Sequence, residues 1–95
     1  MYRAEIIANQ SVQDDIVEVL EDTINGILYS IVPVVYGRGK KEYKLGTTTW
    51  PETNFMLISY VDDDQVSILR KAIAAVKEKF ANEGIKCFIM KVIES

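Results

Sequence analysis

Residues 2–36 read YRAEIIANQSVQDDIVEVLEDTINGILYSIVPVVY, and this stretch contains the pattern that decides the fold. Strand-forming residues dominate Tyr2–Ala8, and Ser11 with an acidic residue three positions later is typical of a helix N-cap. Apolar residues then recur at spacing four, which predicts an amphipathic helix that ends at Gly26, a usual left-handed C-terminal residue. Ile27–Tyr36 is again rich in strand formers, so the stretch predicts one strand–helix–strand unit.

The same unit recurs in the second half of the chain. Asn54–Val61 is a predicted strand, and one of the acidic residues 62–64 can cap a helix that extends to Glu83. Each predicted helix is followed by a Gly-Ile pair, and the second pair leads into a last strand over Ile85–Ile93. The order βαββαβ predicts a single ferredoxin-like α+β domain over residues 1–95, with an antiparallel four-stranded sheet and two helices on one face.

The predicted strands are apolar on both faces, although two helices can cover only one face of the sheet. Pro33 cannot donate a ladder hydrogen bond, which predicts that the second strand lies at an edge of the sheet or is bulged. In the last three strands two apolar sets alternate, and one set of each pair must form a surface away from the helices. The pairs are Ile27, Tyr29, Ile31 and Val35 against Leu28, Val32, Val34 and Tyr36; Phe55, Leu57 and Val61 against Met56, Ile58 and Tyr60; and Ile85, Cys87 and Ile89 against Phe88, Met90 and Val92. Such a surface is too apolar to remain in water, so we expect it to pack against the sheets of identical chains.

Charge and composition exclude several classes of function. The formal net charge is −3, whereas a nucleic-acid-binding module usually has a basic face, so no nucleic-acid partner is expected. No run of 18 or more apolar residues occurs, which argues against membrane insertion, and a strand pattern at the N-terminus argues against a signal peptide. The single Cys87 lies in an apolar run and is expected to be a reduced, buried thiol, which favours the cytoplasm.

Few side chains are candidates for catalysis. The chain contains no His, so a Cys/His nucleophile pair is impossible, and no catalytic residue or enzyme activity is predicted. The acidic run 62–64 is interpreted as helix capping rather than as a cation site. Glu5 is expected at an edge or in a salt bridge with Arg3 or Lys91.

The two halves are joined by residues 37–53, which read GRGKKEYKLGTTTWPET and contain the only Trp. Structureless connections of this length are uncommon in compact domains and are usually functional or disordered. Burying a Trp removes ~150–250 Å² from water, which argues against a free tether. We therefore interpret the segment as the working part of the protein, a loop that folds against a ligand, a neighbouring subunit or a target protein.

The start of this loop has the chemistry of an anion site. Gly37 and Gly39 allow backbone amides to approach an anion closely, and Arg38 between them offers a planar fork for phosphate or carboxylate. Lys40 and Lys41 add positive charge beside a surface that is otherwise acidic. These five residues are the predicted ligand-binding set, and a solvated, positively charged turn is the alternative interpretation.

The rest of the loop is predicted to contact a target. The candidate contact residues are Tyr43, Thr47, Thr49, Trp50 and Glu52. The Thr hydroxyls and the Glu52 carboxylate offer oxygens to a hard cation, but the set has too little charge for a convincing metal site, so none is predicted. Trp50 and the Pro that follows it are expected to pack the returning end of the loop onto a subunit.

Three short stretches make the chain resemble the P-II family of nitrogen-regulatory signalling proteins. Residues 3–7, RAEII, are similar to the first strand of the family. Residues 36–39, YGRG, resemble the step at which the long loop of the family, the T-loop, leaves the second strand. Residues 45–54, LGTTTWPETN, look like the Gly-Thr-x-Thr-Trp-Pro-Glu-x-Asn signature of a P-II-like branch.

The resemblance implies a homotrimer whose sheets face inward, with small anionic metabolites or adenine nucleotides bound in three clefts between subunits. It also implies that the T-loop-like segment 37–53 contacts a transporter, an enzyme or a regulator, and that Tyr43 is a candidate for uridylylation. The chain departs from nucleotide-binding members at residues 82–85, where their Gly-rich, Lys-containing loop is missing. It also has Gly39 where they usually carry Gln, and it lacks their basic C-terminal arm.

Two other ferredoxin-like classes are alternatives. One is a trimer similar to the divalent-cation tolerance proteins, which would be stabilised by metal ions, although a chain without His and with one Cys offers few ligands for them. The other is a small enzyme similar to the acylphosphatases, which need an anion-cradling loop with an Arg after the first strand. Residues 9–11 at that place are Asn-Gln-Ser.

Overall fold

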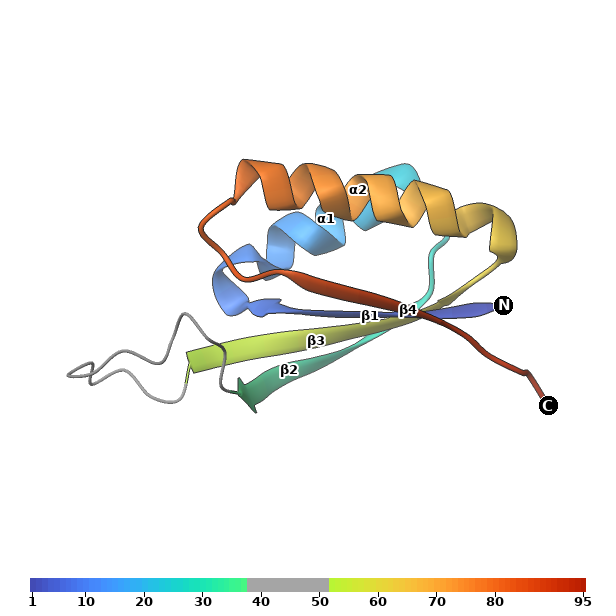
Figure 1. The fold of residues 1–95 in the computed structure, drawn as a ribbon, viewed down its shortest axis with the longest axis horizontal. Helices are drawn as coiled ribbons and strands as arrows, with labels where there is room; N and C mark the ends of the chain where they lie inside the picture. Colours follow the sequence, from blue (N-terminus) through green and yellow to red (C-terminus); the bar gives the residue numbers. More distant parts are fainter. Residues whose placement is uncertain (38–51) are drawn as a thin grey trace.

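The computed structural model describes residues 1–37 and 52–95 of the chain. Its elements are β1 (Tyr2–Asn9), α1 (Gln13–Thr23), β2 (Tyr29–Gly37), β3 (Glu52–Val61), α2 (Val66–Lys79) and β4 (Lys86–Lys91), with short 3-10 turns η1 (Gln10–Val12) and η2 (Asp63–Gln65) before the helices. The strands form one antiparallel sheet in the order β2-β3-β1-β4, and both helices cover the same face (Figure 1). This arrangement confirms the predicted ferredoxin-like βαββαβ sandwich.

Polar residues cap the short 3-10 turn that precedes each helix, and one of these caps differs from the prediction. Asn9, not Ser11, is the first cap, because its side chain accepts a hydrogen bond from the backbone N–H of Ser11 at 2.9 Å and starts the η1 turn. Asn often bonds the amide two residues later in this way. At the second helix Asp62 forms the predicted cap, a capping box in which its backbone N–H donates to Gln65 Oε1 at 2.9 Å.

The junction after α1 follows the prediction at its glycine but not at the start of the strand. Gly26 has a φ of 72°, the left-handed conformation expected of a residue that ends a helix. The backbone N–H of Ile27 donates to the Ile24 carbonyl at 3.2 Å, so Ile27 still belongs to the turn. Strand β2 therefore begins at Tyr29 rather than at Ile27.

The junction after α2 looks similar in sequence but has a different conformation. The helix ends at Lys79 rather than at Glu83, and the Glu83 N–H closes a further turn on the Phe80 carbonyl at 2.9 Å. Gly84 does not have a positive φ, so this turn needs no left-handed residue. Strand β4 is also shorter at both ends than the predicted Ile85–Ile93.

The hydrophobic core lies between the sheet and the two helices. Its largest fully buried side chains come from β1, β3, η1 and both helices: Ile6, Phe55, Leu57, Val12, Ile16, Leu20 and Leu69. Ser59 is the one buried polar side chain in the part of the chain that the structure describes. Its hydroxyl donates to the Leu28 carbonyl at 2.7 Å, so the buried group is satisfied.

Strand β2 forms one edge of the sheet, and its register shifts between Val32 and Val35, so that Pro33 lies at a bulge. Both outcomes that this proline predicts are therefore found at the same place. The Pro33 carbonyl accepts a hydrogen bond from the Gln10 side chain, which connects the edge to the end of β1. Because a bulge inserts an extra residue, the alternation predicted for β2 is interrupted beyond Val32.

Candidate functional site

The sheet face opposite the helices carries large apolar side chains that the described chain leaves uncovered. We call this surface the open face, and the strand register assigns to it Arg3, Glu5, Ile7, Ser30, Val32, Met56, Ile58, Tyr60, Lys86, Phe88 and Met90. Phe88 and Tyr60 are about half exposed, at 52% and 51%, and Met90 and Val32 are 41% and 38% exposed. Isolated apolar side chains are normal on a protein surface, but a contiguous patch usually marks an interaction site.

A polar cluster lies within this apolar surface, and we call its members, Arg3, Glu5 and Tyr60, the Arg3 cluster. The Arg3 Nη1 donates to the Tyr60 hydroxyl at 3.2 Å, and the Arg3 Nη2 forms a salt bridge with Glu5 Oε2 at 3.0 Å. The guanidinium also lies 6.0 Å from the centre of the Tyr60 ring, within cation–π range. The hydrogen bonds to Tyr60 and Glu5 raise the pKa of Arg3. Of the two predicted partners for Glu5, Arg3 is therefore confirmed.

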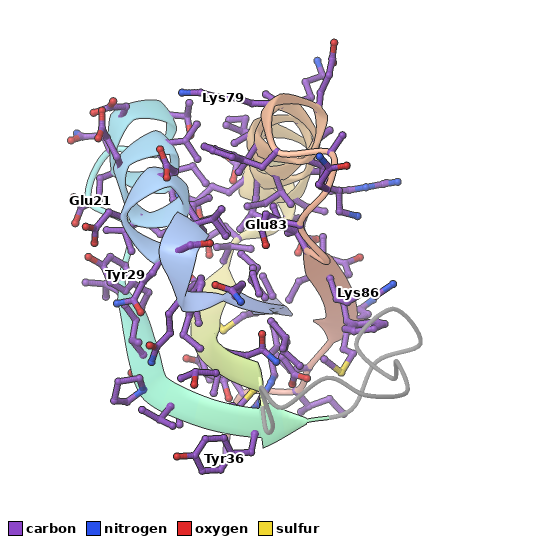
Figure 2. All side chains as sticks on the ribbon, turned by 90° about the vertical axis from the view of Figure 1, so that its left-hand side faces the viewer. Glu21, Tyr29, Tyr36, Lys79, Glu83 and Lys86 are labelled. Carbon is purple, nitrogen blue, oxygen red and sulfur yellow. The ribbon has the colours of Figure 1, made fainter. Side chains whose placement is uncertain are left out.

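The predicted working loop joins β2 and β3 at one end of the sheet. Gly37 and Glu52 form the last pair of the ladder between these strands, so the two ends of the loop start side by side. The junction between α2 and β4 lies at the same end of the molecule (Figure 1). Figure 2 looks at this end and shows Glu83 in that junction and Lys86 at the start of β4, while Tyr36 on β2 points away from the helices.

Most of the predicted loop site lies outside the described residues. Gly37 and Glu52 are placed as the loop base, as the last residue of β2 and the first of β3. The remaining predicted ligand and contact residues are outside the described ranges: Arg38, Gly39, Lys40, Lys41, Tyr43, Thr47, Thr49 and Trp50. Their roles as anion site and target-contact site therefore stay predictions.

The α2–β4 junction uses backbone amides that a phosphate cradle would need to leave free. The Glu83 N–H is bonded to the Phe80 carbonyl at 2.9 Å, and the Ile85 N–H to the Glu83 carbonyl at 3.0 Å. A cradle presents several successive amides to the anion, together with positive charge. This junction instead places an acidic residue, Glu83, at the same end of the molecule as the loop base (Figure 2), which matches the departure from nucleotide-binding members noted in the sequence.

A groove of 590 Å³ lies along the outer edge of β4, on the opposite side of the sheet from the open face. It is lined by Tyr2, Asp63, Val66, Ser67, Arg70, Cys87 and Ile89. Cys87 is half-buried rather than fully buried, because β4 is an edge strand that α2 covers only in part. Burial raises the pKa of the Cys87 thiol, and the positive charges of Lys77 and Arg70 oppose this only in part.

Neither a metal centre nor a membrane span is found within residues 1–37 and 52–95. These residues contain no group of three or more His, Cys, Asp and Glu side chains arranged to hold a metal ion. In the same ranges, no helix is long and apolar enough to cross a membrane. The open face and the loop base are therefore the features that suggest a function.

Comparison with solved structures shows that this is the fold of P-II-like signalling proteins. Over 96% of the chain, the fold matches a P-II-like protein of Thermus thermophilus with a TM-score of 0.64 and 17% identity, covering 85% of that chain. The apo form of CPII, a nitrogen regulatory P-II-like protein of Thiomonas intermedia, matches with a TM-score of 0.64, 20% identity and coverage of 96% and 89%. CPII bound to ADP, AMP and bicarbonate matches with a TM-score of 0.64, 17% identity and coverage of 96% and 86%.

No protein-family model matches the chain, and no curated protein matches it either. The fold that the P-II-like resemblance implies is therefore confirmed, over 96% of this chain and 85–89% of the matched chains, while the loop signature at residues 45–54 stays a prediction. At this level of identity a shared fold does not establish a shared ligand, because unrelated activities occur on one fold.

Proposed function

We propose that this protein is a non-enzymatic, cytoplasmic regulator of the P-II-like type, which assembles as a homotrimer through the open face. In this proposal a small anionic metabolite or nucleotide binds in the clefts between subunits, and residues 37–53 contact a target protein. The observation that carries the proposal is the apolar open face, which belongs to the same sheet whose end forms the base of the loop. Covering that face with copies of the chain would bring each loop base close to a neighbouring subunit.

The neighbours in structure suggest which ligands to test first. CPII has been crystallised with ADP, AMP and bicarbonate, and also with ADP, AMP and acetate. All of these ligands carry a phosphate or a carboxylate-like group, which an Arg fork and free backbone amides recognise well. Arg38, between Gly37 and Gly39, is the residue of this chain with that chemistry at the predicted place. The backbone N–H groups of Glu83 and Ile85 are already hydrogen-bonded within the chain, so they are not available to a row of phosphates. This favours a small anion over a nucleoside triphosphate.

The ligand proposal can be tested by isothermal titration of the full chain with bicarbonate, acetate, AMP and ADP, each measured separately. At least one of these anions is expected to bind, and Arg38→Ala should weaken binding by at least about ten-fold because it removes the charged fork. Lys71→Ala is the matched control, since it removes one exposed positive charge on α2, far from the loop in sequence. Equal affinities in the two variants, or no binding of any anion by the wild type, would contradict the proposal.

We further propose that the loop changes conformation when the ligand binds, which can be followed at Trp50 because it is the only Trp in the chain. If the loop changes its packing when a ligand binds, the intensity and wavelength of the intrinsic fluorescence should change along the same curve as the heat of binding. A Trp50→Phe variant provides the blank. Binding without any change in fluorescence would show that the loop does not report the ligand.

A further inference from the structure

The Arg3 cluster lies on the inner strands β1 and β3, toward the end of the open face that is far from the loop base. Arg3 lies on β1, an inner strand of the sheet, directly opposite Tyr60 on β3 and Met90 on β4. Glu5 lies in the same way opposite Ile58 and Phe88. The charged pair is therefore flanked on both sides by large apolar side chains rather than placed at a polar rim.

Within one chain this cluster contributes little to the stability of the fold. The Arg3 and Glu5 side chains remain 30% and 24% exposed, and ion pairs in contact with water usually contribute little to the stability of a fold. Apolar residues at the two positions would give a more uniform surface for packing. The position of the pair therefore suggests a role that arises when the open face is covered.

We propose that the Arg3 cluster selects the register and the number of copies when open faces pack together, an inference that rests on the self-association proposed above. Removing a charge from water costs free energy unless the charge keeps a well-placed partner. Arrangements that leave Arg3 or Glu5 facing only apolar side chains are therefore disfavoured. One polar group in an apolar interface is known to specify register and oligomer state in this way, at some cost in stability.

A second copy of this chain is the occupant that fits the open face. The surface offers apolar area together with the positive charges of Arg3 and Lys86 and the negative charge of Glu5, so a copy supplies complements of both signs. The guanidinium has five N–H donors in a fixed plane, and its bonds to Tyr60 and Glu5 leave capacity for a carboxylate of a neighbouring copy. In a closed ring each Arg3 would then meet a Glu5, and the buried charge would remain balanced.

The inference is tested by sedimentation equilibrium of the full chain, three variants of the cluster and one control variant. The wild type should form one species, and Glu5→Arg should weaken association at least about ten-fold because it places like charges together. The exchange Arg3→Glu with Glu5→Arg should recover most of that loss. The apolar pair Arg3→Met with Glu5→Leu should still associate, but into a mixture of sizes. Glu78→Arg, the same charge change on the exposed side of α2, is the control and should behave as the wild type.

The possible outcomes separate this inference from the proposed function. If the wild type forms a single oligomer, and the apolar pair forms that same oligomer alone, the cluster does not select the assembly and only this inference fails. If the wild type is a monomer at every concentration, the occupant is not a second copy and both fail. Circular dichroism of each variant verifies the fold, and Glu5→Gln replaces any variant that does not fold, with a weaker loss of selectivity expected.

Discussion

The two faces of the sheet are built from similar residues but differ in what covers them. On the face below the helices, Phe55 and Leu57 of β3 are 0% exposed. On the open face, Tyr60 of the same strand and Phe88 of β4 remain about half exposed. The comparison shows that one chain supplies a complete core for one side of its sheet and leaves the apolar side chains of the other side exposed.

The polar groups of the two faces show the same difference. The buried Ser59 on the covered face is satisfied inside the chain by the Leu28 carbonyl. The Arg3 cluster on the open face is paired within the chain but keeps contact with water. The polar group under the helices is thus buried and satisfied by folding alone, whereas those on the open face are paired but still partly exposed.

The largest expected effect comes from removing a ring from each face. Phe55→Ala should lower the free energy of unfolding by about 3–5 kcal/mol, because it leaves a cavity in the core. In the monomer, Phe88→Ala should lower the free energy of unfolding by less than about 0.5 kcal/mol, because the ring is already half in water. Both values are measured by urea unfolding followed by circular dichroism.

Protein concentration distinguishes the two Phe variants further. The decrease in the free energy of unfolding caused by Phe55→Ala should be the same at all protein concentrations, since the cavity lies inside one chain. The loss in Phe88→Ala should grow with concentration, because an interface stabilises the folded state by mass action. A concentration-independent effect of Phe88→Ala would contradict the role of the open face in assembly.

A smaller effect is expected from the polar groups. Ser59→Ala should lower the free energy of unfolding by about 1–2 kcal/mol, because it leaves the Leu28 carbonyl without its donor. Tyr60→Phe removes the hydroxyl that accepts a hydrogen bond from Arg3 on the open face. It should leave the free energy of unfolding of the monomer unchanged. Thermal unfolding at low concentration measures both, and an equal loss in the two variants would show that the faces do not differ in this respect.

The turns that connect each helix to the following strand allow another comparison, with an expected effect on stability of similar size. Gly26→Ala should destabilise the protein by about 1 kcal/mol, because an L residue is strained at its φ of 72°. Gly84→Ala should be neutral or slightly stabilising, because Gly84 has no positive φ and no atom lies within 4 Å of an added Cβ. Urea unfolding of the two variants side by side is the measurement, and a larger loss for Gly84→Ala would contradict the assigned turns.

The smallest expected effect is a dependence on pH at Cys87. Its thiol has a raised pKa in the folded state because of burial, so the folded chain holds this proton more tightly than the unfolded chain does. The contribution is fully present below the unfolded value of 9.0 and is lost as the pH rises through the folded pKa. Cys87→Ala should therefore unfold with a shallower decrease in stability above pH 9.0 than the wild type, measured by thermal melts between neutral and alkaline pH. Identical slopes would show that the thiol is not desolvated.

Features with a local cause could be predicted from the sequence. Pro33 lacks an N–H, so it indicated either an edge or a bulge, and β2 has both. The acidic run after the third strand predicted a cap, which Asp62 forms, and Gly26 has the predicted left-handed conformation. The apolar alternation of β3 and β4 likewise predicted the open face, because each strand carries that information within a few residues.

Features that depend on distant pairing could not be predicted in the same way. The alternation assigns Tyr60 only to an apolar face, whereas its hydroxyl accepts from Arg3, 57 positions away, because the register places the two residues opposite each other. The local sequence pattern likewise favoured Ser11 as the helix cap, whereas in the structure Asn9 at the end of β1 forms the cap. Of the predicted loop site, only the pairing of Gly37 and Glu52 is described, and the contacts that a loop makes with a ligand depend on groups outside the chain.

The central claim is that copies of this chain cover the open face, and hydroxyl-radical footprinting of the purified full chain tests it most directly. Met90 and Phe88 should react as freely as the comparably exposed Ile68 in dilute protein, after correction for intrinsic reactivity. At concentrations where the chain associates, both should become as protected as Phe55, while Ile68 stays reactive. Full oxidation of Met90 and Phe88 at every concentration would show that the face remains in water and would contradict the account.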